Sequence, residues 1–129
     1  MSGRIVHFEI PYDDGERAGA FYREAFGWNI QVIPEMNYTM ASTGPVGDGG
    51  IPQEPGFING GMLRREEPIG SPVVTIDVED IDAALEKVVS LGGSTVVARQ
   101  QVADMGFSAY FKDSEGNVMG LWQTAGPAS

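Results

Sequence analysis

The sequence contains an internal repeat, and this repeat limits the possible folds more than any other feature. A shift of 66 positions aligns the first part of the chain with the second without a gap. The aligned pairs are His7 with Val73, Ile10 with Ile76, Asp14 with Asp80, and Gly27 with Gly93. Further along, Tyr38–Thr39 corresponds to Phe107–Ser108 and Gly56–Gly60 to Gly116–Gly120, with the offset changed by a longer loop in the first half. Such an ordered series indicates a duplicated module.

The first half reads as a strand, a helix and three further strands. Apolar residues at every second position alternate with His7 and Glu9 over residues 5–11, which is the period of a two-faced strand. A helix follows, with Asp13–Asp14 as its N-cap, capping-box spacing from Asp13 to Glu16, and a stop at Gly27. Strands are predicted at 29–33, 38–42 and about 57–64, the last after a glycine- and proline-rich loop, residues 43–55, whose role as a lid or as a disordered segment stays open.

The second half predicts the same order of elements. It comprises a strand at 73–78, a helix from the Asp80 cap to Gly92–Gly93, and strands at 94–99, 107–112 and 117–123. We therefore expect a single α+β domain over residues 1–129. Module one covers about 4–64, a linker 65–72, and module two about 73–124. A half of about 65 residues buries little apolar surface alone, so the two modules should pack together.

Charge and composition exclude several classes of function. The chain has 8 basic and 18 acidic residues, a formal charge of −10 and no cysteine. Disulfides and thiolate sites are thereby excluded. The negative charge makes nucleic acid and anionic membranes unsuitable partners. No apolar stretch approaches the roughly 20 residues that span a bilayer, and no signal peptide is evident, so we expect a cytoplasmic protein.

Two segments carry a resemblance to a known family: "HFEIPYDDGERAGAFYREAFGW" near the start of the chain and "FKDSEGNVMGLWQ" near its end. With this order of elements, the chain resembles the glyoxalase/bleomycin-resistance/dioxygenase (vicinal oxygen chelate) superfamily over essentially its whole length. This resemblance implies two tandem βαβββ modules that form a curved mixed sheet around a cavity, with the helices outside. It also implies a homodimer and one metal ion, held by side chains on the first and fourth strands of each module.

The ligand positions implied by the resemblance are mostly occupied by residues that cannot bind a metal. His7 matches the first-strand position of module one, but its counterpart in module two is Val73. The last-strand positions fall on Gly120 and on Gly60, or on Gly61 after a slip of one residue. Valine and glycine side chains offer no lone pair. We expect no family metal site and no cofactor, and at most weak binding of a divalent ion.

Strand alternation and the resemblance together suggest a small-molecule pocket. Its candidate lining combines apolar, aromatic and polar residues: His7, Glu9, Tyr38, Met40, Gly60, Met62, Val73, Thr75, Gly120 and Trp122. His7 is the only histidine, and with Glu9 beside it on one face the pair forms a candidate general base.

Three functions remain open at this stage. The favoured hypothesis is a binding protein that holds a small hydrophobic or cationic molecule, as bleomycin-resistance proteins of the superfamily do. The alternative is a glyoxalase-like lyase or isomerase, or a dioxygenase-type enzyme, that acts on a small carbonyl or aromatic substrate through His7, Glu9, Tyr38 or Tyr110. The third is a dimerising or regulatory component of a larger assembly.

Overall fold

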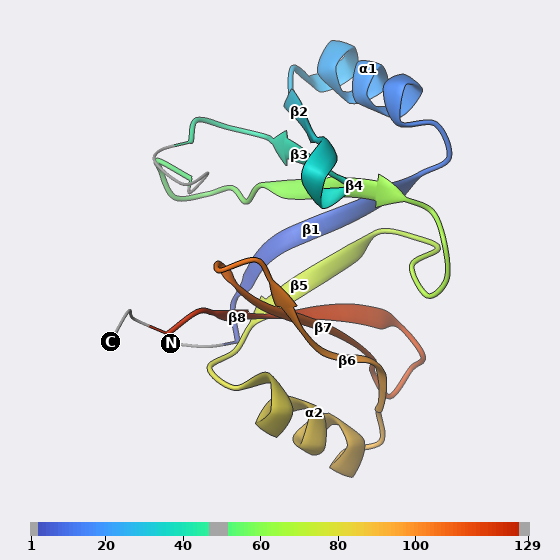
Figure 1. Ribbon diagram of the computed structural model, residues 1–129, viewed down its shortest axis with the longest axis vertical. Helices are drawn as coiled ribbons and strands as arrows, with labels where there is room; N and C mark the ends of the chain where they lie inside the picture. The colour runs from blue at the N-terminus through green and yellow to red at the C-terminus, as the bar shows by residue number, and fades with distance from the viewer. Residues whose placement is uncertain (1–2, 47–51, 127–129) are drawn as a thin grey trace. The chain divides into compact units, whose positions relative to one another are not determined.

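A computed structural model describes residues 3–46 and 52–126 and divides them into two compact units. The N-terminal unit is His7–Pro72, and the C-terminal unit contains the described residues 3–6 and 73–126. Each unit has one principal helix and a small sheet, labelled along the chain in Figure 1. Residues 47–51 of the predicted loop lie outside the described part of the chain.

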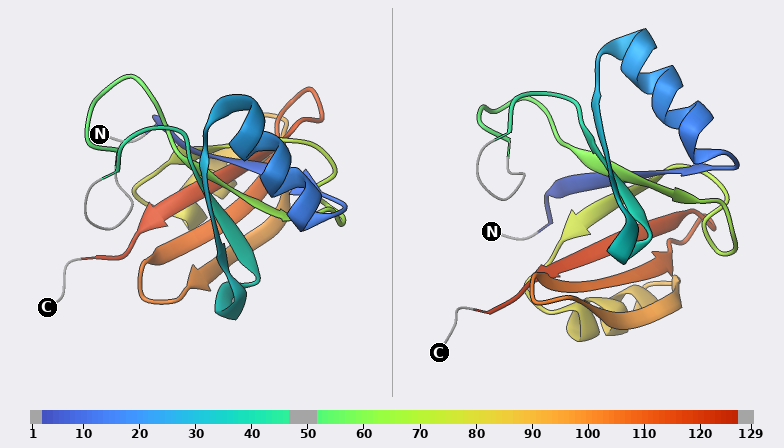
Figure 2. Two further views of the ribbon diagram at one scale, coloured as in Figure 1. Left: turned by 90° about the horizontal axis from the view of Figure 1, so that it is seen from above. Right: turned by 45° about the horizontal axis from the view of Figure 1, so that its top comes forward.

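The N-terminal unit is built on a four-stranded mixed sheet in the order β1–β4–β3–β2. Its strands are β1 (Ile5–Tyr12), β2 (Asn29–Ile33), β3 (Tyr38–Ser42) and β4 (Gly60–Arg64). β1 and β4 are parallel, whereas β4–β3 and β3–β2 are antiparallel. Helix α1 (Gly15–Phe26) joins β1 to β2, and the short 3-10 helix η1 (Pro34–Met36) joins β2 to β3. Figure 2 shows these elements from two further directions.

The C-terminal unit repeats this arrangement. Its sheet has the order β5–β8–β7–β6, with β5 and β8 parallel and the other two pairs antiparallel. The strands are β5 (Val73–Asp77), β6 (Ser94–Val102), β7 (Gly106–Lys112) and β8 (Val118–Thr124), and helix α2 (Ile81–Ser90) follows β5. The predicted α+β class and the βαβββ order of each half are confirmed.

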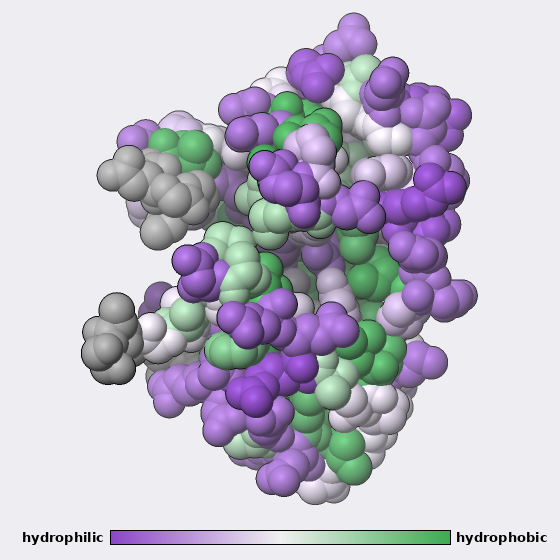
Figure 3. All heavy atoms as spheres, viewed as in Figure 1, coloured by the Kyte–Doolittle hydropathy of each residue, from purple (hydrophilic) through white to green (hydrophobic). Residues whose placement is uncertain are grey.

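Each helix packs on one face of its own sheet. In the C-terminal unit, Ile81 and Leu85 of α2 form a buried core with three residues of β7 and β8, which are Ala109, Phe111 and Leu121. Below α1 the packing is aromatic, because Trp28 stacks on Tyr22 with ring centroids 4.7 Å apart and contacts Phe8 at 5.7 Å. On the face shown in Figure 3, the surface around α1 is largely hydrophilic, although Phe21 and Phe26 of this helix are exposed. Among the described residues, no helix is long and apolar enough to cross a membrane.

The helix ends follow from local side chains. The carboxylate of Asp14 accepts a hydrogen bond from the backbone N–H of Arg17, so Asp14 is the N-cap, while Asp13 instead pairs with Arg65 at 3.0 Å. The capping-box expectation at Asp13 was therefore one residue early. Gly27 ends α1 in the left-handed region at φ 75°, as the sequence predicted.

The strand bounds differ from expectation mainly at β4. The predicted strand at 57–64 begins only at Gly60, because the preceding residues bond elsewhere. The carbonyl of Ile58 accepts a hydrogen bond from the Thr43 hydroxyl, and the side chain of Asn59 accepts one from the Thr43 backbone.

Replacing the two neighbouring aspartates tests the assignment of the cap. Asp14→Ala should lower the free energy of unfolding by about 1 kcal/mol, because it leaves a backbone donor of α1 without its side-chain acceptor. Asp13→Ala removes only an exposed ion pair and should cost less than about 0.5 kcal/mol. Urea denaturation of both variants measures the difference, and a larger loss for Asp13→Ala would contradict the assignment.

Candidate functional site

The face of the N-terminal sheet away from α1 carries the polar residues of the candidate site, which are His7, Glu9 and Tyr38. Alternation on β4 separates the two faces, because a Cβ atom added to Gly60 would collide with Phe8, whereas one added to Gly61 would overlap Tyr38. Phe8 packs on Trp28 beside α1, so Gly61 and Tyr38 mark the opposite face. His7 and Glu9 alternate with Phe8 on β1, which puts them on this opposite face with Tyr38.

Tyr38 crosses a neighbouring strand to reach His7 and Glu9. It belongs to β3, and β4 lies between β3 and β1 in the sheet. The phenol therefore lies over Gly61, where any side chain would occupy the same space. At the far side its hydroxyl is 2.8 Å from Nε2 of His7 and donates a 2.9 Å hydrogen bond to Oε2 of Glu9. These three side chains form the His7–Tyr38–Glu9 cluster.

The cluster fixes the direction of its hydrogen bonds. A phenol has one proton, and Tyr38 donates that proton to Glu9. Its oxygen must therefore accept from His7, so Nε2 of His7 carries a hydrogen. In the neutral ring the remaining lone pair is on Nδ1, and no described residue hydrogen-bonds to that atom.

Burial keeps this histidine neutral over a wider pH range than usual. Desolvation lowers the pKa of His7 below its ordinary 6.5, and the nearby Glu9 carboxylate raises the pKa only enough to oppose part of that effect. Glu9 itself is buried, with 8% of its surface exposed. The site thus combines a neutral imidazole, a phenol and a buried carboxylate.

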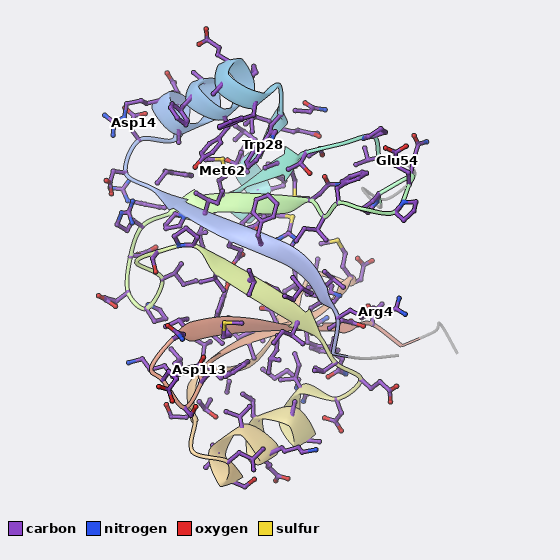
Figure 4. All side chains as sticks on the ribbon, turned by 180° about the vertical axis from the view of Figure 1, so that it is seen from behind. Arg4, Asp14, Trp28, Glu54, Met62 and Asp113 are labelled. Carbon is purple, nitrogen blue, oxygen red and sulfur yellow. The ribbon has the colours of Figure 1, made fainter. Side chains whose placement is uncertain are left out.

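The predicted residues of the N-terminal unit divide between the two faces. His7, Glu9, Tyr38 and Met40 share the face away from α1, since Met40 lies opposite Gly61 in the β3–β4 register. Gly60 and Met62 alternate to the other face, and Figure 4 shows Met62 near Trp28, on the side that α1 covers. The structure therefore does not bring Gly60 and Met62 to the His7 face; Gly61 is the glycine of the site.

The four predicted residues of the C-terminal unit share one face of their sheet. Thr75 is paired with Gly120, and a Cβ atom on Gly120 would lie 2.7 Å from the Thr75 hydroxyl. Val73 lies two residues before Thr75 on β5, and Trp122 lies two residues after Gly120 on β8, so both share the face of that pair. This face is the one away from α2, because the intervening Leu121 belongs to the core below α2.

Sequence analysis missed Asn59, which lies immediately before β4. Asn59 is 8% exposed, and its Nδ2 is buried without a hydrogen-bond partner among the described residues. Nothing in the local pattern distinguishes it from an ordinary loop asparagine.

A groove of about 320 Å³ in the same unit, bordered by Tyr12, Arg17 and Arg65, lies beside the start of α1 and does not include the His7–Tyr38–Glu9 cluster.

Sequence comparisons connect the chain to glyoxalase-like proteins. A family model described as bleomycin resistance protein-like N-terminal matches residues 4–44. Proteins of Mycobacterium bovis and Mycobacterium tuberculosis, both named "Putative glyoxylase CFP32", are 30% identical over 120 residues, covering 89% of this chain but only 43% of theirs. A "Glyoxylase-like domain-containing protein" of Didymella fabae is 29% identical, covering 92% of this chain and 91% of that protein.

Solved structures share the fold. A variant of Streptomyces coelicolor methylmalonyl-CoA epimerase has a TM-score of 0.65 at 18% identity, covering 98% of this chain and 100% of the other. A glyoxalase/bleomycin resistance protein/dioxygenase superfamily member from Vibrio splendidus has a TM-score of 0.59 at 16% identity, covering 95% and 98%. The resemblance to the glyoxalase/bleomycin resistance/dioxygenase superfamily is confirmed.

The residues at the superfamily's metal positions do not fit a metal site. The strand registers place Gly61 beside Glu9 and Gly120 beside Thr75, so both fourth-strand positions lack a side-chain donor. Val73 offers none either, and Nε2 of His7 is already engaged by Tyr38. Within residues 3–46 and 52–126, no group of three or more histidine, aspartate or glutamate side chains could hold a metal ion.

Adding one methyl group at Gly61 tests the crossing of Tyr38 over β4. Gly61→Ala should lower the free energy of unfolding by about 1–3 kcal/mol, because the new Cβ atom overlaps the phenol and forces it or the strand to move. Gly70→Ala is the matched control, since a Cβ atom there meets nothing within 4 Å, and it should change stability by less than about 0.5 kcal/mol. Urea denaturation compares them, and equal stability would refute the crossing.

An NMR titration of the single histidine tests the electrostatics of the cluster. The ring of His7 should titrate below pH 6.5, and Glu9→Gln should lower its pKa further by removing the charge that raises it. Between the folded pKa and 6.5 the unfolded chain binds more protons than the folded one. The His7 contribution to stability is therefore complete above pH 6.5 and is lost as the pH falls through that window. A ring pKa above 6.5 would contradict this account.

Proposed function

We propose that the chain is a glyoxalase/bleomycin-resistance-like protein that binds a small hydrophobic or cationic molecule, without a metal, on the His7 face of its N-terminal unit. The observation that carries the proposal is the Tyr38 hydroxyl held between His7 and Glu9. These polar groups are already oriented by one another, so a ligand need not order them on binding. Met40 on the same face adds an adaptable apolar contact.

Charge favours a cationic ligand over an anionic one. Glu9 contributes a buried carboxylate, while the lowered pKa of His7 keeps the imidazole uncharged near neutral pH. The formal charge of −10 adds a long-range attraction for cations. The phenol of Tyr38 and the imidazole of His7 stack at 6.3 Å and could face a quaternary ammonium group. The methylmalonyl-CoA epimerase neighbour is bound to a CoA ester, whose phosphates this negative charge would repel.

Catalysis is the second candidate, and the protonation of His7 favours it. With Nε2 carrying the hydrogen bonded to Tyr38, Nδ1 presents a lone pair that can accept a proton from a bound substrate. The chain would then be a glyoxalase-like lyase or isomerase acting on a small carbonyl compound. Turnover of such a compound that is lost in His7→Gln, with an unchanged circular dichroism spectrum, would favour this candidate.

The assembly and location belong to the same proposal. We infer a homodimer in the cytoplasm, with residues 1–129 acting as one domain. Sedimentation of the purified chain at two concentrations measures the dimer directly.

A pair of isosteric probes tests metal-free binding. Protein treated with EDTA should bind phenyltrimethylammonium at least threefold more tightly than neutral tert-butylbenzene, because only the cation is attracted by Glu9 and by the aromatic rings. Glu9→Gln should abolish that preference, whereas Asp113→Asn, in the exposed turn of the C-terminal unit, should preserve it. Ligand-detected NMR measures the affinities.

Native mass spectrometry after exposure to Zn²⁺, Ni²⁺, Mn²⁺ and Fe²⁺ measures how many metal ions each chain binds. One ion per chain, lost in His7→Ala, would refute the proposal.

A further inference from the structure

Asn59 presents a buried hydrogen-bond donor that the fold does not use. Asn59 is 8% exposed, and its Nδ2 atom is buried without a hydrogen-bond partner among the described residues. A buried amide without a hydrogen bond is costly, so its presence calls for a specific explanation.

Exchanging the positions of Oδ1 and Nδ2 in the Asn59 side chain would not give the buried donor a partner. Oδ1 of Asn59 accepts a 2.7 Å hydrogen bond from the backbone N–H of Thr43 and lies 3.5 Å from the Thr43 hydroxyl. If the amide were turned over, a donor would face the Thr43 N–H, which is itself a donor. The contact with Thr43 therefore fixes Nδ2 as the unused group.

The strand register places this donor next to the cluster. In the parallel β1–β4 pair, Phe8 lies opposite Gly60, the first residue of β4, and Asn59 directly precedes Gly60 as His7 directly precedes Phe8. Continuing this register and the strand alternation by one residue before Gly60 puts Asn59 beside His7, on the face of Gly61. On this continued register the unused donor of Asn59 borders the His7–Tyr38–Glu9 cluster.

We propose that Nδ2 of Asn59 donates a hydrogen bond to a carbonyl or carboxylate oxygen of the bound molecule. This inference rests on the proposed function and narrows it, because it requires a ligand with an oxygen acceptor beside its apolar or cationic part. Recognition of this kind discriminates strongly, since an analogue without the oxygen leaves the buried amide unpaired. Asn59 is then a specificity-determining residue of the site.

Two probes that differ only at the acceptor test the inference. The first is 4-acetyl-N,N,N-trimethylanilinium, and the second is 4-ethyl-N,N,N-trimethylanilinium, which has the same charge and nearly the same shape but no carbonyl. The wild-type chain should bind the acetyl probe about tenfold more tightly, the ratio expected for one satisfied buried hydrogen bond. In protein labelled selectively with ¹⁵N-asparagine, the Asn59 side-chain amide signals should shift with the acetyl probe and not with the ethyl probe.

Two variants separate recognition from folding. Asn59→Asp retains an acceptor for the Thr43 N–H but loses the donor, so the affinity ratio of the two probes should fall to about one. The added carboxylate attracts the cationic group of both probes alike, and its repulsion of the acetyl oxygen can only lower the ratio further, so it cannot restore the preference. Thr43→Val removes the hydroxyl contacts of Thr43 and keeps Nδ2, and it should preserve the tenfold ratio.

The outcomes distinguish the inference from the function on which it rests. Equal binding of both probes by the wild-type chain, with unshifted Asn59 amide signals, would overturn the inference and leave metal-free binding intact; an ordered water would then satisfy the amide. Binding of neither probe would overturn both. If Asn59→Asp does not fold, the amide signals of the wild-type chain still decide the matter.

Discussion

The candidate site depends on one steric constraint, which is the empty space above Gly61. Tyr38 and its two partners are separated by a whole strand, and the phenol can reach them only because that strand has no side chain at the crossing point. The same glycine removes the donor that a fourth-strand metal ligand would supply. Gly61 therefore has two consequences: it lets the His7–Tyr38–Glu9 cluster assemble, and it is one of the positions, with Val73 and Gly120, that offer no metal ligand.

This coupling explains how a superfamily fold can keep a polar site while lacking the metal ligands. The carboxylate and the imidazole point at a shared position, and a phenol hydroxyl occupies it at 2.8 and 2.9 Å. A hydroxyl satisfies both groups without bringing a charge, so burial of the imidazole lowers its pKa instead of stabilising its protonated form. The result is a hydrogen-bonded cluster that combines an uncharged imidazole with a buried carboxylate.

Local patterns predicted most of the fold because their causes are local. The repeat located both helices and eight strands, and β2 and β3 were predicted to the residue. Alternation on β1 put His7 and Glu9 on one face correctly. The error at Gly60 and Met62 arose because side chains alternate with a period of two, so a slip of one residue on β4 exchanges the two faces.

The sequence by itself determined the order of elements, the start of the first helix to within one residue at Asp13–Asp14, its end at Gly27, and the placement of His7 and Glu9 on one face. Each of these follows from the sterics and hydrogen bonding of residues a few positions apart. Sequence analysis had put Tyr38 in the same pocket lining as His7 and Glu9, but only the tertiary structure decided that its hydroxyl would bond to both of them. It also decided that Asn59 would be buried with an unused donor. Those facts depend on which strands are neighbours and in which register, and these are set by the packing of the whole unit.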